Sequence, residues 1–122
     1  MEMLLKGKTA VITGPAKGMG RAISTALAKE GVNLALLGRD IKAIEAVVVD
    51  AEHLGVKAKA IQCDVTKGHM VERAIRDVMS WTKKIDILVN VAGGTGPIGK
   101  TGLETSETEF DDIIKLNLGG VF

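Results

Sequence analysis

Three glycines are close together in the segment TGPAKGMG, at Gly14, Gly18 and Gly20. The segment follows the β-prone run KTAVIT and precedes a helical pattern of apolar residues. Because glycine has no Cβ, such a loop lets the backbone approach a ligand, and the following helix directs its N–H groups at an anion. The order G-x-x-x-G-x-G differs from the common dinucleotide pattern G-x-G-x-x-G, and glycines at a helix start can also serve tight packing alone. The position at a first strand-to-helix turn favours a pyrophosphate site.

Two further polar residues follow strand-forming runs. Asp64 and then Val65 come after the third run, and Asn90 comes near the end of the fourth, before the segment VAGG. Each polar residue also has a simpler interpretation. The aspartate can cap the helix that follows Thr66, and the asparagine can form a turn before the two glycines.

Asn117 is a polar residue on a helix face that is otherwise apolar. Phe110, Ile113 and Ile114 define that face by their helical spacing. A buried amide needs hydrogen-bond partners, so we expect Asn117 to have a structural or a catalytic role.

Four runs of residues predict the strands that would position these side chains. They are residues 8–13, 32–37, 56–61 and 85–91. Two of the runs are nearly continuous apolar stretches, which is typical of strands that are covered on both faces of a parallel sheet.

Helical patterns lie between and after these runs. They begin at Met19, after Asp40 and Thr66 as N-caps, and at a capping box formed by Ser106 and Glu109. The apolar face expected for the first helix comprises Ala22, Ile23, Ala26 and Leu27. Strand and helix thus alternate four times, which predicts an α/β fold, a Rossmann-like doubly wound parallel sheet in three layers. We expect residues 1–122 to form one domain.

Composition narrows the classes of partner. Sixteen Lys and Arg residues against fifteen Asp and Glu give a net charge of +1 without a basic cluster, so we expect neither nucleic acid nor a membrane as partner. The amino terminus has no signal-peptide pattern and no apolar run could span a bilayer, so we expect a cytoplasmic protein. Cys63 is the single cysteine and is interpreted as a small buried hydrophobe. His53 and His69 lack a second ligand at metal spacing, so no metal site is expected.

Four motifs, taken in order, resemble those of the short-chain dehydrogenase/reductase family. They extend from the glycine loop through the pairs after the third and fourth strands to the asparagine in KLNLGGVF, and the resemblance runs from about Lys6 to Phe122. It is broadest to the 3-oxoacyl-carrier-protein reductases, with sugar-alcohol and hydroxysteroid dehydrogenases near them. Val91 departs from the family's Asn-Asn-Ala-Gly motif, since it stands in place of the second asparagine.

The resemblance implies site residues and a reaction. It implies hydride transfer between a nicotinamide coenzyme and a ketone or secondary alcohol, with Asp64 and Val65 at the adenine ring and Asn117 in a water-linked proton relay. The coenzyme-binding residues that the resemblance implies, together with the cations near the end of the second strand, are Gly14, Ala16, Lys17, Gly18, Met19, Gly20, Arg39, Asp64, Val65, Asn90, Ala92 and Gly93.

The end of the second strand bears on the choice of coenzyme. Gly38 stands where NAD-preferring relatives have an acid, and Arg39 follows with a planar fork that suits a phosphate. Lys17, before the second loop glycine, is a further cation. These residues favour NADP(H). The alternative is NAD, with Asp40 accepting from the ribose and Arg39 only solvated, although Asp40 also suits helix capping.

The sequence contains no tyrosine. The resembled family uses a Tyr-x-x-x-Lys pair with a serine, which lie beyond Phe122 in the family's order. We therefore expect the coenzyme-binding half of a longer reductase, which resemblance implies to be a homodimer or homotetramer. A fourth strand without a further neighbour would be an apolar, unguarded edge, which supports that expectation. The alternatives are a non-catalytic nucleotide-binding fragment or an interaction module. An S-adenosylmethionine site would need an acid where Gly38 stands.

Overall fold

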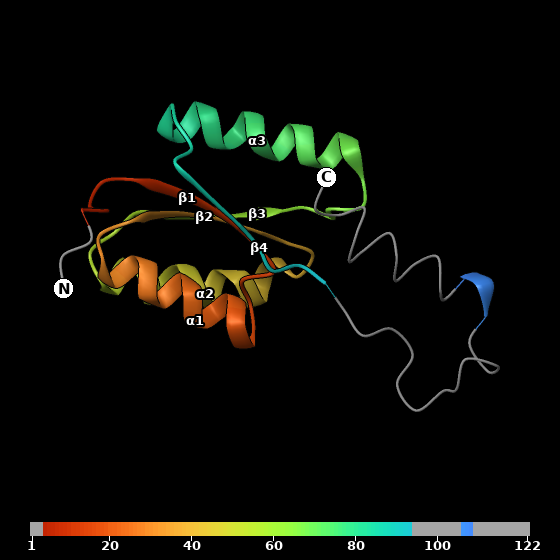
Figure 1. Cartoon of the computed structure of the whole chain (residues 1–122), viewed down its shortest axis with the longest axis horizontal. Helices are drawn as coiled ribbons and strands as arrows, with labels where there is room; N and C mark the ends of the chain where they lie inside the picture. Colours follow the sequence, from red (N-terminus) through yellow and green to blue (C-terminus); the bar gives the residue numbers. More distant parts are fainter. Residues whose placement is uncertain (1–3, 94–105, 109–122) are drawn as a thin grey trace.

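Strands and helices alternate along residues 4–93, which with residues 106–108 are the part of the chain that the computed structural model describes. In chain order these elements are β1 (Thr9–Thr13), α1 (Gly18–Lys29), β2 (Asn33–Gly38), α2 (Ile41–His53), β3 (Ala58–Gln62), α3 (Gly68–Thr82) and β4 (Ile87–Asn90). The strands run parallel in one sheet, with α1 and α2 on one face and α3 on the other (Figure 1). The predicted α/β, Rossmann-like fold in three layers is therefore confirmed.

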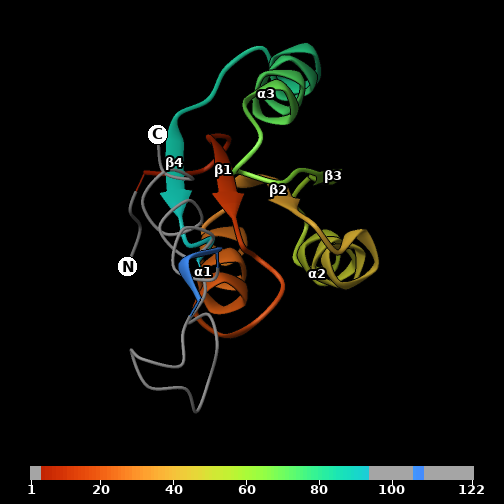
Figure 2. The same ribbon diagram turned by 90° about the vertical axis from the view of Figure 1, so that its right-hand side faces the viewer.

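The order of the strands in the sheet is β3-β2-β1-β4. The chain builds outward from β1 to β3 and then returns through α3 to the other side of β1, as the view along the sheet shows (Figure 2). Such a reversal leaves a crevice outside the carboxyl ends of the two strands on either side of it, where α/β sheets bind ligands. The point of reversal here lies between β1 and β4.

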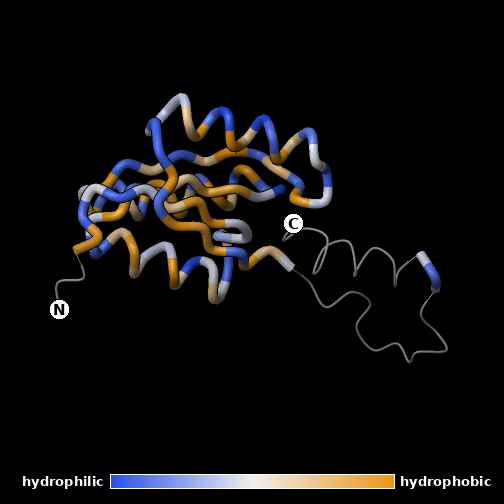
Figure 3. The backbone as a smooth tube through the Cα atoms, turned by 45° about the horizontal axis from the view of Figure 1, so that its top comes forward, coloured by the Kyte–Doolittle hydropathy of each residue, from blue (hydrophilic) through white to orange (hydrophobic). Residues whose placement is uncertain are grey.

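Alternation along the strands divides the apolar side chains into two cores. Hydrophobic and hydrophilic residues alternate along the helices that cover the sheet, as the colours of the backbone show (Figure 3). Even-numbered residues of β1 and β2 pack against α1 and α2, whereas odd-numbered ones pack against α3, because successive side chains of a strand point to opposite faces. The first core contains Ala10, Ile12, Ala28, Val32, Leu34, Leu36, Ile44, Val47 and Ala51. The second contains Val11, Ala35, Leu37, Ile61, Cys63, Ala74 and Val78. Burial on both faces explains why β2 is a continuous apolar run.

The buried face of α1 differs from the expected one. Its buried residues are Gly20, Ser24 and Ala28, while Ala22 and Ala26 of the expected face are exposed and Ile23 and Leu27 are half-buried. Position 20 can face inward only because it is a glycine, since a Cβ there would overlap the carbonyl oxygen of Gly14. The Ser24 hydroxyl remains buried by donating to the Gly20 carbonyl oxygen at 2.8 Å. Apolar periodicity could not predict a buried face made of small and polar residues.

Of the predicted helix caps, Asp40 is confirmed and Thr66 is wrong. The Asp40 carboxylate accepts from the Ala43 N–H at 3.2 Å and caps α2. Thr66 does not cap α3, which has Lys67 as its N-cap residue without a side-chain hydrogen bond. Instead, the Thr66 N–H and hydroxyl both donate to Asp64 Oδ1, at 2.9 and 2.6 Å, and form a turn before the helix. The fourth predicted helix lies almost wholly outside the described residues.

Within the described residues, β4 pairs with β1 alone and forms one edge of the sheet. Leu88 of β4 is 59% exposed there, on the face that α3 covers over the other strands. No helix in the described part of the chain has the length and apolar character to cross a bilayer.

Candidate functional site

The carboxyl ends of the four strands surround a cavity of about 950 Å³. Cofactor sites in proteins have volumes of roughly 300–1,000 Å³, so the cavity is at the upper end of that range. It is lined by Gly14, Pro15, Ala16, Lys17, Leu37, Gly38, Arg39, Asp40, Ile41, Lys42, Ile44, Cys63, Asp64, Val65, Val91, Ala92 and Gly93. These residues come from the loops after the four strands, from the end of β2 and from the start of α2. The parallel sheet brings them to one edge, although the sequence separates them widely.

The loop after β1 has the shape that its glycines allow. Gly14 has a φ of +66°, and a Cβ there would lie 2.8 Å from the Ala92 backbone nitrogen. Gly18 has a φ of +51°, but a Cβ there would meet nothing within 4 Å. Gly14 is therefore needed for contact between the two loops, whereas the space beside Gly18 is open to a ligand.

Within the described part of the chain, the amino terminus of α1 has no side-chain cap beside this loop. Its first residue is Gly18, and the N-cap residue Lys17 makes no side-chain hydrogen bond to the first turn. The first N–H groups of a helix have no carbonyl partner within the helix, and with the helix dipole they favour an anion. A phosphate group fits this donor set and the open space beside Gly18.

The Thr13 hydroxyl connects the end of β1 to the residues after β4 by hydrogen bonds. Its Oγ1 accepts from the Val91 N–H at 3.1 Å and from the Ala92 N–H at 3.2 Å. The side chain is 6% exposed, so these amides are satisfied in a largely dry environment. The loop after β4 is thus held against the glycine loop.

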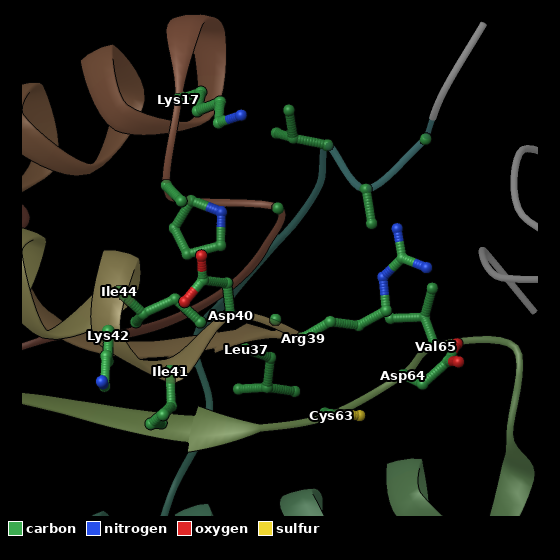
Figure 4. Close-up of a pocket in the computed structure, with 17 residues that line it drawn as sticks. Lys17, Leu37, Arg39, Asp40, Ile41, Lys42, Ile44, Cys63, Asp64 and Val65 are labelled. Carbon is green, nitrogen blue, oxygen red and sulfur yellow. The ribbon is translucent and has the colours of Figure 1, made fainter. Parts of the chain in front are cut away.

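Cations lie on two sides of the cavity. In Figure 4 the Lys17 ammonium and the Asp40 carboxylate project on one side, while the Arg39 guanidinium extends toward Asp64 and Val65. At Gly38 a Cβ would lie 2.8 Å from Ile44 Cδ1, the flexible end of a side chain. The end of β2 therefore offers no carboxylate at position 38 and has a guanidinium immediately after it.

Asp64 carries a stabilised negative charge at the end of β3. Hydrogen bonds from the Thr66 hydroxyl and the Thr66 N–H lower the pKa of Asp64, and the positive charges of Arg39 and Lys67 lower that pKa further. Both Thr66 bonds go to Oδ1, so Oδ2 has no hydrogen-bond partner among the described residues. The carboxylate therefore has a local structural role and still has acceptor capacity toward the cavity.

Cys63 is confirmed as a small buried hydrophobe. Its side chain is 1% exposed, belongs to the core beneath α3 and borders the cavity. Burial raises the pKa of the Cys63 thiol, and the neighbouring Asp64 charge raises it further. Both effects disfavour the thiolate, which is the nucleophilic form of a cysteine.

The structure brings most of the expected site residues together. Those that line the cavity are Gly14, Ala16, Lys17, Arg39, Asp64, Val65, Ala92 and Gly93. Gly18, Met19 and Gly20 begin α1 and Asn90 ends β4, next to the cavity but not among its lining residues. Asn117 lies outside the described residues. In the described part of the chain, no three His, Cys, Asp or Glu residues are grouped as metal ligands.

Sequence reasoning missed several contributors to this site, and three of them bear directly on its charge and shape. Lys42 and Ile41 line the cavity from the first turn of α2, and Thr13 fixes the loop after β4. The position of Lys42 two residues after the α2 cap is the signal that could have indicated it. The bond partners of Thr13 are 78 and 79 residues away, so no local pattern could indicate them.

A family model described as short chain dehydrogenase matches residues 8–122. Among curated proteins, the 3-oxoacyl-[acyl-carrier-protein] reductase FabG of Staphylococcus epidermidis is 44% identical over 119 residues. That alignment covers 94% of this chain and 47% of the relative. The chain therefore spans about half the length of the curated relatives it matches.

Solved structures of dehydrogenases and reductases are also similar to this chain. A short-chain type dehydrogenase/reductase from Mycobacterium marinum is similar with a TM-score of 0.90 and 32% identity, covering 97% of this chain and 47% of that one. Xylitol dehydrogenase bound to NAD⁺ has a TM-score of 0.88 and 30% identity, with 97% and 45% covered. Actinorhodin polyketide ketoreductase with NADPH has the same score and identity, with 94% and 43% covered. Since these neighbours hold different coenzymes, overall similarity does not choose between NAD and NADP. What it does establish, with the family match, is that this chain belongs to the short-chain dehydrogenase family.

Proposed function

We propose that this chain is the NADP(H)-binding part of an oxidoreductase that interconverts a ketone and a secondary alcohol. The observation that carries the proposal is the cavity at the strand ends, where Lys17 and Arg39 are both present and position 38 has no carboxylate. The chain spans about half of its relatives, so the activity is proposed for the whole protein.

The glycine loop supports binding of the pyrophosphate. The open space beside Gly18 admits an anion close to the backbone, and the first-turn N–H groups of α1 point their partial positive charge at it. Gly14 lets the loop after β1 lie close to Ala92 in the loop after β4. One cavity is lined by residues after β3 and by residues after β4. This shape suits an elongated dinucleotide.

The cations support a 2′-phosphate on the adenosine ribose. Arg39 presents a planar fork of donors and Lys17 a compact ammonium, and both suit a phosphate with its two negative charges. A carboxylate at position 38 would repel that phosphate, and Gly38 provides none. NAD is the alternative coenzyme, with the Asp40 carboxylate accepting from the ribose 2′-hydroxyl.

The remaining residues receive roles in the reaction. When bound, the coenzyme supplies or takes up the hydride. Val65 offers an apolar contact and Asp64 Oδ2 a hydrogen-bond acceptor for the adenine at the end of β3. Asn90, Ala92 and Gly93 would border the nicotinamide half, and Asn117 would hold a water that relays protons. The tyrosine and lysine implied for protonating the alkoxide are proposed to lie in the rest of the protein, since these 122 residues contain no tyrosine.

The substrate class is proposed from the relatives. The name of the Staphylococcus epidermidis relative, 3-oxoacyl-[acyl-carrier-protein] reductase, supports a 3-oxoacyl thioester as the ketone. A cytoplasmic location and a homodimeric or homotetrameric whole protein remain predictions from the sequence.

Titration of the coenzymes onto matched variants tests the proposal. Arg39→Ala should raise the Kd of NADPH about 10-fold to 100-fold, because it removes charge-assisted bonds to the 2′-phosphate, and should leave the Kd of NADH nearly unchanged. Arg73→Ala is the matched control, since Arg73 is an exposed residue of α3 away from the cavity. Equal effects of Arg39→Ala on both coenzymes would contradict the choice of NADP(H).

The same titration separates the alternatives. Absence of NADPH and NADH binding by the unaltered chain at micromolar concentrations would favour an interaction module, for which exposed Leu88 at the β4 edge would be a contact. Binding without activity in the whole protein would favour a non-catalytic nucleotide-binding protein.

A further inference from the structure

A second cavity lies at the edge of the sheet where the strands begin, opposite to the cavity proposed for the coenzyme. Lys57 and Ala58 stand at the amino end of β3, and α3 ends over the same edge (Figure 1). The cavity has a volume of about 390 Å³ and is lined by Glu52, Gly55, Val56, Lys57, Ala58 and Trp81. Sites for small molecules have volumes of roughly 300–1,000 Å³, so this one suits a small ligand.

Three polar side chains border this cavity without a partner among the described residues. The Glu52 carboxylate and the Lys57 ammonium form no ion pair, either with each other or with another residue in that part of the chain. The Trp81 side chain is half-buried, and its indole N–H donates no hydrogen bond there. Because a buried indole N–H usually finds an acceptor, a ligand could supply one.

The backbone around the cavity is held in place by the fold. The Lys57 N–H donates to Asn33 Oδ1 at 3.0 Å, and the Lys57 carbonyl oxygen accepts from the Leu34 N–H at 2.9 Å. Gly55 has a φ of +91°, and a Cβ there would meet nothing within 4 Å. The glycine therefore turns the chain after α2 and leaves the space beside it open.

The charges at the cavity suit a ligand that carries both signs. Glu52 is in the last turn of α2, where the negative end of the helix dipole adds to the attraction of its carboxylate for a cation. Lys57 offers a cation to a ligand carboxylate. A ligand with a single charge would be repelled by one of these two side chains, whereas a zwitterion is attracted by both. The indole ring of Trp81 adds an apolar surface.

We propose that this cavity binds a free α-amino acid with an apolar side chain. The ligand ammonium lies toward Glu52, its carboxylate toward Lys57 and its side chain against the Trp81 ring. The inference does not depend on the proposed coenzyme binding, because the two cavities share no lining residue. Both charged side chains are exposed, so the expected Kd is about 0.1–1 mM.

Titration of L-leucine and L-phenylalanine onto the protein tests the site. Ligand-observed NMR gives the Kd, and the emission of Trp81, the single tryptophan of these 122 residues, should change with the same Kd. N-acetyl-L-leucine lacks the ammonium and L-leucinamide lacks the carboxylate, so each should bind about threefold or more weakly than L-leucine. Saturating NADPH should leave the Kd of L-leucine unchanged, since it occupies the other edge of the sheet.

Variants that each remove one charge identify the residues responsible. Lys57→Met and Glu52→Gln keep most of the side chain, and each should raise the Kd of L-leucine about threefold to fivefold. Lys59→Met on β3 and Glu45→Gln on α2 are the matched controls, because both residues are exposed on the same elements but do not line the cavity. The controls should leave the Kd of L-leucine within about twofold of the unaltered protein.

Four outcomes would overturn the inference. One is the absence of saturable binding of both amino acids up to about 10 mM, well above the expected Kd. Another is equal affinity for L-leucine and its two derivatives, which would mean apolar contact alone. The third is the same Kd in Lys57→Met as in Lys59→Met at equal melting temperatures. Displacement of L-leucine by NADPH is the fourth. Failure of the proposed function is distinguishable, because it appears as absent or unselective NADPH binding and leaves the Kd of L-leucine unaffected.

Discussion

The glycines of the β1–α1 loop differ in the physical reason for having no side chain. At Gly14 a Cβ would press on the Ala92 backbone, and at Gly20 it would overlap the Gly14 carbonyl oxygen. At Gly18 the surrounding space is open, and only the φ of +51° and a ligand would constrain the residue. The sequence spacing predicted that the loop exists. It could not distinguish the glycines that the fold needs from the one that a ligand needs, because this depends on how the loop folds back on itself and on its contact with the loop after β4.

Alanine substitutions should separate these reasons. Gly20→Ala should lower the free energy of unfolding by about 1–3 kcal/mol, because its Cβ overpacks a rigid backbone contact. Gly18→Ala should cost only about 1–2 kcal/mol of left-handed backbone strain yet weaken NADPH binding strongly. Urea unfolding and NADPH titration measure the two effects.

Gly55→Ala is the matched control for Gly18→Ala. Gly55 also has a positive φ, of +91°, and open space around it, but it is absent from the coenzyme cavity. It should lose similar stability and keep its affinity for NADPH. A similar loss of affinity in both variants would show that Gly18 has no special place at the ligand.

At the scale of elements, the site depends on how β1 and β4 are joined. Thr13 pairs in register with Asn90, and its hydroxyl continues the contact by accepting from the next two N–H groups of the chain. The sequence predicted both strands and placed Thr13 in the glycine-loop motif. It could not predict the hydroxyl contact, since that depends on the register of strands that are far apart in sequence. The face of α1 was predicted wrongly for a related reason, because small residues carry little periodic signal.

Replacing Thr13 tests this junction. Thr13→Val keeps the shape of the side chain but leaves the Val91 and Ala92 amides without their acceptor, so it should destabilise the protein by about 1–3 kcal/mol. It should also raise the Kd of NADPH, because the loop after β4 borders the cavity. Thr13→Ser retains the hydroxyl and should restore most of both properties. If valine and serine behaved alike in urea unfolding, the hydroxyl would not be the junction.

At the scale of the whole molecule, the alternation of strands and helices in the sequence was enough to predict the α/β architecture. The nearly continuous apolar run of β2 indicated a sheet covered on both faces, and the burial of Leu34 to Leu37 confirms it. The cavity itself could be predicted only in part, because its walls come from strand ends, loops and the start of α2, which are far apart in sequence and meet only in the folded sheet. Lys17, Arg39 and Asp64 were identified by their places after strands, whereas Lys42 and the direction of each side chain required the structure.

Acid should destabilise the whole fold through two carboxylates. The Thr9 N–H, with smaller contributions from Lys84, lowers the pKa of Asp86, and the Thr66 bonds lower that of Asp64. A carboxyl whose pKa is lower in the folded state contributes its stability above the ordinary value of 3.8 and loses it as pH falls through and below that value. The free energy of unfolding from this source should thus be constant from neutral pH to about pH 5 and fall below about pH 4.

Variants identify the carboxylates responsible. Asp86→Asn should flatten the acid-side loss measured by urea unfolding at a series of pH values, whereas Asp77→Asn, at an exposed position of α3, should follow the unaltered protein. An identical acid profile for Asp86→Asn and the unaltered protein would exclude Asp86 as a contributor.

We propose that the cavity at the strand ends binds NADP(H) with its 2′-phosphate between Lys17 and Arg39. A crystal structure of the protein with NADP⁺ tests this directly. The pyrophosphate should lie at the amino terminus of α1, and 2′-phosphate oxygens should lie about 3 Å from the Arg39 guanidinium and the Lys17 ammonium. A coenzyme bound outside this cavity, or bound in it with the 2′-phosphate turned to solvent away from both cations, would contradict it.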